Sequence, residues 1–321
     1  MKKRIFALFL VAAIAVVAVS LVGCSDDNDN DDFEIPDYIT IRGTRYSTSL
    51  TELDLNGERL IRPLTDDEIE SLKYMINLTE LHLQHNEISD ISPLVGLTNL
   101  ERLWLNNNRI TDISPLSELT NLTILDLGND FTDEFIDLDL FRLNSNQISD
   151  LSALAGLTNL TSLRLHNSAV NDISALAELT ALESLFLFGN QIVDISPLAK
   201  LTNLTTLALG GNIISDVSVL SSLVNLEMLV LGSNRLTDIS ALAELTNLTS
   251  LGLNANQIID VSPLVELINL EQLLLNGNQI SDMSVLSELT NLTELWIAYN
   301  PISAEQIQEL REALPNTQII E

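Results

Sequence analysis

The chain has few of the side chains that enzymes and metal centres use for chemistry. Its 321 residues include one cysteine and three histidines. A single cysteine excludes an internal disulfide, and no HExxH, GxSxG or glycine-rich phosphate loop occurs in the sequence. His82 and His85 are close together, but nothing completes a metal shell around them. These absences predict a protein with no catalytic centre, no bound metal and no cofactor.

Positive charge is also scarce. Fifteen Lys and Arg stand against 45 Asp and Glu, which gives a formal net charge of −30 at pH 7. Such a surface repels phosphate groups, so binding to nucleic acid or to anionic lipid headgroups is disfavoured. Hydrophobic residues nevertheless make up 46% of the chain. To bury that many apolar side chains in so acidic a protein requires a regular arrangement.

Residues 1–23 are typical of an export signal. Basic residues at 2–4 precede an almost purely apolar stretch over 5–19, as in a secretory leader. The following Leu-Val-Gly-Cys resembles the lipobox of bacterial lipoproteins. This resemblance implies cleavage before Cys24, a diacylglycerol on its thiol, and attachment to the outer side of a bacterial membrane, at the cell surface or facing the periplasm. A plain signal peptide or a signal anchor with a chance cysteine is the alternative.

Residues 24–37 are dominated by Asp and Asn and contain little that would stabilise an ordered fold. We therefore expect an acidic, solvated tether between the lipid and the folded part. A calcium-binding loop is the alternative, although no glycine or spaced glutamate completes an EF-hand pattern.

The remainder of the chain is repetitive. The pattern L-x-x-L-x-L-x-x-N-x-I-x-D-I-S-x-L-x-x-L-x-N recurs from Leu50 to about Pro301. Successive copies start 22 residues apart, except for an interval of 38 residues after Leu122. The leading leucines are Leu78, Leu100, Leu122, Leu160, Leu182, Leu204, Leu226, Leu248, Leu270 and Leu292.

This pattern resembles the leucine-rich repeats of internalin-like bacterial surface proteins. The resemblance implies an α/β repeat solenoid, a horseshoe with a parallel β-sheet on its concave face and short helical turns on its convex face. One coil cannot bury its own core, so stability depends on stacking. We expect an N-terminal cap with a first degenerate repeat over 38–77, repeats over 78–301 and a C-terminal cap over 302–321.

Each recurring position has a physical reason. The L-x-L pair alternates as in a half-buried strand. Asp and Ser in D-I-S-x-L cap a short helical turn that begins with proline in four copies, at Pro93, Pro115, Pro197 and Pro263. A buried asparagine eight residues after the leading leucine is expected to bond backbone groups of neighbouring coils, as a ladder. These asparagines are Asn86, Asn108, Asn190, Asn212, Asn234, Asn256, Asn278 and Asn300.

The interval of 38 residues has two interpretations. It is either one coil with a sixteen-residue insertion or two coils with six residues missing. Leu138, Phe141 and Leu143 fit the strand template, so the sequence slightly favours a shortened extra coil. Acidic residues in this segment are expected to form a solvated bulge, with calcium binding as the alternative. They are Asp130, Asp133, Glu134, Asp137 and Asp139.

The copies differ most at the outward positions of the strands. Both tryptophans, Trp104 and Trp296, fall in the single outward column between the two strand leucines. The N-terminal part of the concave face is charged and the C-terminal part is apolar, and contiguous exposed apolar residues usually mark a binding surface. The predicted partner-binding residues are Arg102, Trp104, Arg142, Arg164, Phe186, Phe188, Val230, Leu274, Trp296 and Tyr299.

The sequence therefore predicts a non-enzymatic, monomeric surface lipoprotein that binds another macromolecule, a protein, on its concave face. By the internalin-like resemblance this partner is a surface protein of a host or neighbouring cell. A passive envelope element and a glycan-binding module are the rival hypotheses. Both tryptophans are expected to be solvent-exposed, because they are expected to anchor the partner.

Overall fold

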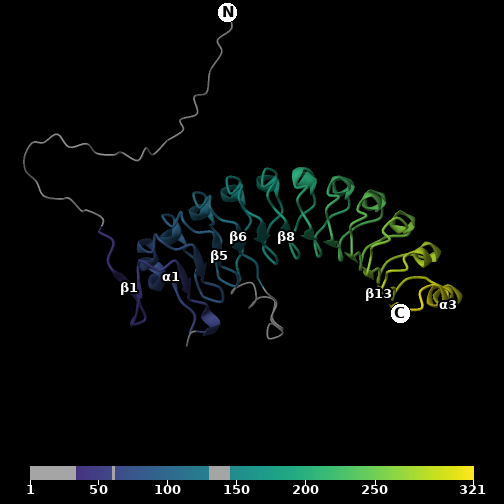
Figure 1. Cartoon of the computed structure of the whole chain (residues 1–321), viewed down its shortest axis with the longest axis horizontal. Coiled ribbons are helices and arrows are strands. Elements are labelled where there is room, and N and C mark those ends of the chain that lie inside the picture. Colours follow the sequence, from purple (N-terminus) through teal and green to yellow (C-terminus); the bar gives the residue numbers. More distant parts are fainter. Residues whose placement is uncertain (1–33, 60–61, 130–144) are drawn as a thin grey trace, which may run out of the picture. The chain divides into compact units, whose positions relative to one another are not determined.

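The computed structural model describes residues 34–59, 62–129 and 145–321. Residues 35–321 form one compact unit, in which a parallel sheet lines the inner side of an arch and short helical turns line its outer side (Figure 1). This arrangement confirms the predicted solenoid. The sheet runs from β3 (Glu52–Asp54) through β4 (Glu80–His82), β5 (Arg102–Trp104), β6 (Ile124–Asp126), β7 (Ser162–Arg164), β8 (Ser184–Phe186), β9 (Thr206–Ala208), β10 (Met228–Val230), β11 (Ser250–Gly252), β12 (Gln272–Leu274) and β13 (Glu294–Trp296) to β14 (Gln318–Ile320).

The strand leucines form one continuous core. Leu207 of β9, Leu229 of β10 and Leu251 of β11 pair in register and are completely buried. The next leucine inward in each coil, such as Leu209, is buried as well. Each coil thus covers the open face of its neighbour, as a solenoid requires.

The predicted asparagine ladder is present. The amide nitrogen of Asn234 donates to the carbonyls of Leu209 and Leu231, both at 3.0 Å, and its amide oxygen accepts from the backbone N–H of Ile214 at 3.0 Å. The corresponding asparagine of each regular coil makes the same kind of contacts, so buried backbone groups at the turn are paired within the coil and with its neighbour.

A second, exposed ladder runs along the side of the solenoid, and the sequence interpretation had given its residues no role. The Asn247 amide donates to the Val224 carbonyl at 2.9 Å, and the Thr249 hydroxyl donates to the Glu227 carbonyl at 3.1 Å. Equivalent bonds recur in other coils, for example at Asn203. The recurring Asn and Thr side chains therefore hold successive coils together on this side too.

On the convex side each coil makes a 3-10 turn, and the predicted cap is present. Asp238 accepts from the backbone N–H of Ser240 at 2.8 Å, and this contact, with that of the Ser240 hydroxyl, holds the pKa of Asp238 below its ordinary value. The turns are η3 (Ser92–Leu94), η4 (Ser114–Leu116), η5 (Ser152–Leu154), η6 (Ser174–Leu176), η7 (Ser196–Lys200), η8 (Ser218–Ser222), η9 (Ser240–Glu244), η10 (Ser262–Leu264) and η11 (Ser284–Glu288).

The N-terminal cap begins with an antiparallel hairpin of β1 (Tyr38–Ile41) and β2 (Thr44–Ser47), and the turn between these strands requires the left-handed backbone of Gly43. The short helices η1 (Gly57–Arg59), α1 (Asp66–Ile69) and η2 (Glu70–Tyr74) follow.

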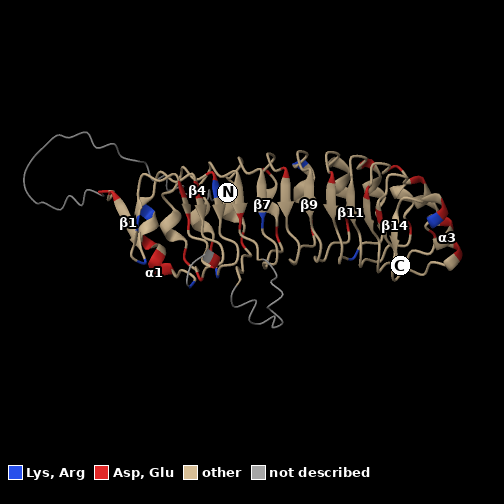
Figure 2. Ribbon diagram, turned by 60° about the horizontal axis from the view of Figure 1, so that its bottom comes forward, with Lys and Arg blue, Asp and Glu red and all other residues tan. Residues whose placement is uncertain are grey.

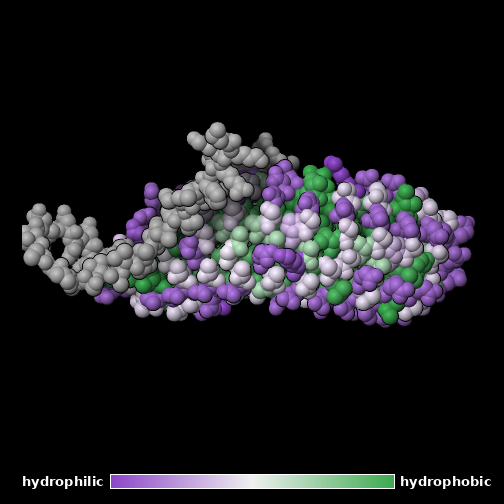
Figure 3. Space-filling model, turned by 90° about the horizontal axis from the view of Figure 1, so that it is seen from above, coloured by the Kyte–Doolittle hydropathy of each residue, from purple (hydrophilic) through white to green (hydrophobic). Residues whose placement is uncertain are grey.

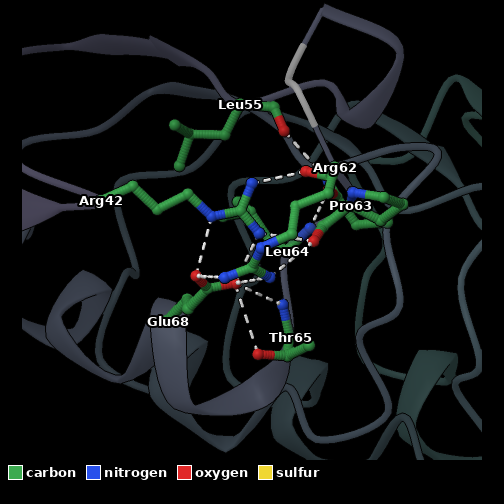
Figure 4. A network of polar contacts seen from close by, with 8 residues as sticks. Arg42, Leu55, Arg62, Pro63, Leu64, Thr65 and Glu68 are labelled. Atoms are coloured by element: carbon green, nitrogen blue, oxygen red, sulfur yellow. Dashed lines mark hydrogen bonds and ion pairs between the residues drawn. The ribbon is translucent and has the colours of Figure 1, made fainter.

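A network of ion pairs at the surface connects the parts of this cap (Figure 4). The Arg42 guanidinium reaches across from the hairpin to both carboxylate oxygens of Glu68 on α1, at 2.7 and 2.6 Å. Arg62 contacts the same carboxylate at 2.9 Å, and the Thr65 N–H donates to it at 3.1 Å. The Arg42 contact, aided by Thr65 and Arg62, lowers the pKa of Glu68 to about 2.

The C-terminal cap agrees with its prediction. Helix α3 (Ala304–Ala313) begins at Ser303, whose hydroxyl accepts from the Gln306 N–H in a capping box. The final strand, β14, pairs with β13. Leu310 and Leu314 are buried against the last coil, so the core is closed at this end.

The interval of 38 residues is one long coil, and the favoured interpretation as a shortened extra coil was wrong. Strand β6 pairs directly with β7, with Leu125 beside Leu163. Asn146 takes the ladder position of the β6 coil, because it accepts from the Ile110 N–H and donates to the Leu127 carbonyl. The additional residues therefore fall, in the sequence, within the coil of β6, between its strand and Asn146. The acidic residues assigned to this segment lie outside the described residues.

Candidate functional site

The candidate site is the outward face of the sheet, where each strand presents alternate side chains. Within the described residues, the five neighbouring strands β8 to β12 place no charged side chain on this face. In Figure 2 the corresponding stretch of strands β9 to β11 is free of red and blue. We call these positions the uncharged floor: Ser184, Phe186, Phe188, Thr206, Ala208, Gly210, Met228, Val230, Gly232, Ser250, Gly252, Asn254, Gln272, Leu274 and Asn276.

The middle of the uncharged floor is made of small residues. Ala208, Gly232 and Gly252 are buried although they face outward, since the neighbouring larger side chains rise above them. Met228 is 42% exposed and Val230 is half-buried. The floor is therefore lowest around β9 to β11 and higher toward the half-buried aromatic and aliphatic side chains of β8 and β12.

The outward face of β4 and β5 differs because its charges neutralise one another. Glu80 contacts the His82 ring at 2.8 Å and the Arg102 Nε at 2.7 Å. These contacts, that of His82 being the larger, hold the pKa of Glu80 below its ordinary value. His82 in turn lies flat against the Trp104 indole, with ring centroids 4.1 Å apart. Arg102 and Trp104 are thus parts of one internally bonded cluster.

Charges on the next two strands of the sheet, β6 and β7, also neutralise one another. Arg164 of β7 lies 3.6 Å from the buried carboxylate of Asp126 on β6, and its guanidinium stands 5.1 Å from the centre of the Phe186 ring. Arg164 is itself exposed. It marks the boundary between the charged strands and the uncharged floor.

The expectation that both tryptophans are solvent-exposed was wrong, because each is only partly exposed. Trp104 and Trp296 are both half-buried. Trp104 loses exposure to the stacked ring of His82, and Trp296 folds onto its own strand, where its indole N–H donates to Glu294 at 2.6 Å. Neighbouring strands about 4.8 Å apart are too close for a large ring to stand clear of them.

Tyr299 is the most exposed aromatic side chain among the described residues. It is 89% exposed and adopts a left-handed backbone conformation with φ of 58°. Other coils use Gly189, Gly211 or Gly277 at this turn, where a bulky residue is disfavoured. Packing does not account for a tyrosine at this position, so it stays a candidate contact residue.

The outward face also contains an aromatic pair that was not recognised as one in the sequence. His166 is buried and stacks on Phe188, with ring centroids 4.6 Å apart. Gly128 of the preceding coil makes room for it, since a Cβ there would lie 2.2 Å from the His166 ring. Glycine opposite histidine in adjacent copies was the signal available in the sequence.

The other predicted site residues are only partly placed. Phe186, Phe188, Val230 and Leu274 all lie on the uncharged floor, half-buried. Arg142 lies outside the described residues.

Three further observations bear on the predicted functions. His85 contacts Asn107 and Glu58, and within the described residues no three His, Cys, Asp or Glu side chains gather as metal ligands would. Among the same residues, no helix has the length and apolar character needed to cross a membrane. Cys24 and the tether up to residue 33 lie outside the described residues.

Comparison with known proteins identifies the repeat. A family model described as leucine-rich repeats matches residues 76–118, 98–139, 136–178, 180–222, 224–266 and 268–312. The chain belongs to the leucine-rich-repeat family. No curated protein matches it in a sequence search.

Solved structures place this leucine-rich-repeat protein near the internalins. An internalin from Listeria monocytogenes is 36% identical over 87% of this chain and 83% of its own, with a TM-score of 0.71. A leucine-rich-repeat protein from Leptospira interrogans is 25% identical over 78% of this chain and 80% of its own, with a TM-score of 0.50. A plant peptide hormone receptor in complex with RGF2 is 20% identical over 85% of this chain and 47% of its own, with a TM-score of 0.63, and shares the fold.

Proposed function

We propose that this leucine-rich-repeat protein is a lipid-anchored surface protein that binds a protein partner on its concave face. The observation that carries the proposal is the uncharged floor. In a protein with a net charge of −30, five neighbouring strands place only uncharged residues on this face, among them Phe186, Phe188 and Met228. The core of a protein interface is likewise depleted of charged residues and enriched in aromatic residues and methionine.

The convex side offers no comparable surface among the described residues. Exposed apolar residues outside the concave face, Val193, Ile259 and Ile268 among them, are separated by hydrophilic ones. Figure 3 shows green patches on this side as islands between purple and white atoms. Single exposed apolar residues are normal on a protein surface, so the concave face is the better candidate.

Within the concave face, the proposed anchors are the side chains on or beside the floor: Phe186, Phe188, Val230, Leu274, Trp296 and Tyr299. Arg164 flanks them at one end. Arg102 and Trp104 belong to the bonded cluster of the first strands and contribute at the edge of the interface. Attachment to the membrane is proposed to depend on a diacylglycerol at Cys24.

A photo-cross-linking pair tests the binding face. A photoreactive residue replaces Val230 on the floor in one full-length variant and Val193, which is 56% exposed on another face, in the other. Both are exposed on intact cells to host-cell and bacterial envelope extracts. We expect a discrete protein adduct at position 230 and none at position 193. Equal labelling at the two positions would contradict the proposal, and capture on a glycan array alone would favour the glycan-binding rival.

Cell fractionation tests the anchor independently. Cys24→Ala removes the proposed acylation site, so the protein should appear in soluble fractions or stay uncleaved. A processed Cys24→Ala protein that stays membrane-bound after a salt wash would show that the lipid is not the anchor.

A further inference from the structure

We propose that the partner segment which occupies the uncharged floor is an amphipathic α-helix with basic residues along one flank. The inference rests on the proposed function, because it takes binding at the concave face as given. It adds the shape and the charge pattern of the occupant.

The sheet itself excludes one mode of binding. Each strand from β8 to β12 is hydrogen-bonded to a strand on both sides. A partner cannot add a strand to a backbone whose bonds are already made. Recognition must therefore use side chains that meet the floor from above.

The dimensions of the floor match a helix that lies across the strands. Three outward positions per strand span about 13 Å along the strand, which accommodates a helix about 10 Å wide. The distance from β8 to β12 is about 19 Å at a strand spacing of about 4.8 Å, or about thirteen residues of helix. The small residues Ala208, Gly232 and Gly252 allow a cylinder to approach closely in the middle.

Acidic residues line the border of the floor at the start of its strands. Glu183, Glu227 and Glu271 stand immediately before β8, β10 and β12 and are exposed. We call these three residues the acidic rim. At the other border the turn residues are Gly189, Gly211, Ser233, Ala255 and Gly277, which carry no charge.

The spacing of the acidic rim sets the spacing expected in the partner. Alternate strands place the carboxylates about 10 Å apart, a distance that a helix covers in about seven residues. Threonines occupy the coils between, where Thr205 and Thr249 bond to Glu183 and Glu227 carbonyls instead of exposing charge. A helix with Lys or Arg at i, i+7 and i+14 on one flank, beside an apolar face, complements this surface in both shape and charge.

Two synthetic helical peptides of eighteen residues test the pattern against the full-length protein. Both carry the same leucine and phenylalanine face and three lysines seven residues apart. In one the lysines flank the apolar face, and in the other they lie opposite it. We expect the flanked peptide to bind about tenfold more tightly at low salt, and this preference to disappear at 0.5 M salt, because exposed ion pairs are screened.

Matched variants assign the effect to the floor and its rim. The triple variant Glu183→Gln, Glu227→Gln, Glu271→Gln should abolish the preference, whereas Glu244→Gln, Glu266→Gln, Glu288→Gln on the convex side, with the same change in charge, should keep it. Gly252→Leu fills the floor without backbone strain, since a Cβ there meets Val230 at 3.6 Å, and should weaken both peptides more than tenfold. Gly96→Leu, at an exposed site with open space, should not.

The outcomes separate this inference from the proposed function. Equal binding of both peptides, lost in Gly252→Leu, would leave the concave face as the binding site and overturn the basic flank. Equal loss in the two glutamine triples would reduce the effect to net charge and overturn it too. No binding of either peptide would overturn the helical occupant, while cross-linking at Val230 would still decide the proposed function.

Discussion

The coils of β4 to β7 and those of β8 to β12 are built from the same repeat but treat their outward face differently. In the first set, Glu80 bonds to Arg102 and Asp126 lies beside Arg164, so charges are neutralised within the protein. In the second set the face has no charge to neutralise. Burial of an unpaired charge under a partner is costly, and the second set avoids that cost. The outward face of β8 to β12 is therefore the part of the concave face that a partner could cover without burying an unpaired charge.

The two sets also differ in the core. From β8 onward every coil has its ladder asparagine, whereas the coil of β7 has Ser168 at that position and the coil of β6 is interrupted before Asn146. The irregular coils are therefore the place where the periodic stabilisation of the solenoid is weakest. Four measurements test how far this difference extends.

The largest effect on stability is expected in the coils of β8 to β12. Asn234→Leu removes four hydrogen bonds and leaves the buried N–H of Ile214 without its partner. The carbonyls of Leu209 and Leu231 each lose one of their donors and keep Asn212 and Asn256. The free energy of unfolding should fall by about 3 kcal/mol. Urea unfolding measures the loss. Asn247→Leu is the control, because its exposed amide makes one bond, and should cost about 1 kcal/mol or less. Similar losses for the two variants would show that the buried ladder contributes no more to the free energy of unfolding than the exposed one.

The tryptophans should differ in their effect on binding, because Trp104 belongs to the first set whereas Trp296 lies on β13, next to the second set. Trp296→Ala and Trp104→Ala are each expected to cost about 2 kcal/mol of stability, because each ring is half-buried. Only Trp296→Ala should also weaken a partner bound at the floor, by about 2 kcal/mol. The affinity of each variant for the partner that cross-linking identifies measures this loss. An equal effect of both tryptophans on binding would extend the interface over the charged strands.

Acid should loosen the N-terminal cap. The pKa of Glu68 is lowered to about 2, so its ionised form stabilises the fold fully above its ordinary pKa of 4.5. That contribution is lost as the pH falls from about 4.5 to 2. Allowing for solvent screening, Glu68→Gln should cost about 1 kcal/mol at pH 7 and almost nothing at pH 2. Glu309→Gln on the exposed side of α3 is the control with the same change in charge, and a pH-independent loss in Glu68→Gln would refute the ion-pair explanation.

The sequence predicted the coil, the ladder and both caps because each depends on residues that recur or lie close in the chain. The sequence interpretation was wrong where the pairing of strands depends on how successive coils stack. Leu138, Phe141 and Leu143 satisfy the strand template locally, yet β7 pairs with β6. A shortened coil starting at Leu122 would also have lacked its own D-I-S-x-L turn, since this motif does not occur between Leu122 and Leu138.

The prediction that the tryptophans are exposed was wrong for the same reason, because it ignored the neighbouring coils. An outward position on a strand was equated with exposure, but the ring of His82 in the neighbouring coil covers part of Trp104. Conversely, the low floor around Gly232 and Gly252 arises from residues that the repeat pattern treats as variable and that contribute nothing to periodicity. Neighbouring columns must be considered together for such a surface to be recognised.

The smallest expected effect concerns Ser168, and it tests whether the irregular coils can be made regular. The Ser168 hydroxyl is buried and finds no hydrogen-bond partner in the described part of the chain. On either side of it, the Asn146 amide oxygen accepts from Ile110 and that of Asn190 accepts from Val170. Ser168→Asn would supply the corresponding amide beside the Ile148 N–H, and one net hydrogen bond should raise the free energy of unfolding by about 1 kcal/mol.

The same variant distinguishes a gap in the ladder from a replacement for it. Asn129 and Asn167 already bond across these coils, each amide donating to the carbonyl of the other residue at 2.8 and 2.7 Å. If this crossed pair is a full substitute, Ser168→Asn will crowd it and lower stability, while Ser168→Ala, which only deletes a hydroxyl without a partner, will be neutral. Urea unfolding of the two variants beside the wild type decides between the alternatives. If Ser168→Asn raises stability and Ser168→Ala does not, the irregular coils differ from the regular ones by one missing ladder asparagine. The crossed bonds of Asn129 and Asn167 would then not replace that asparagine.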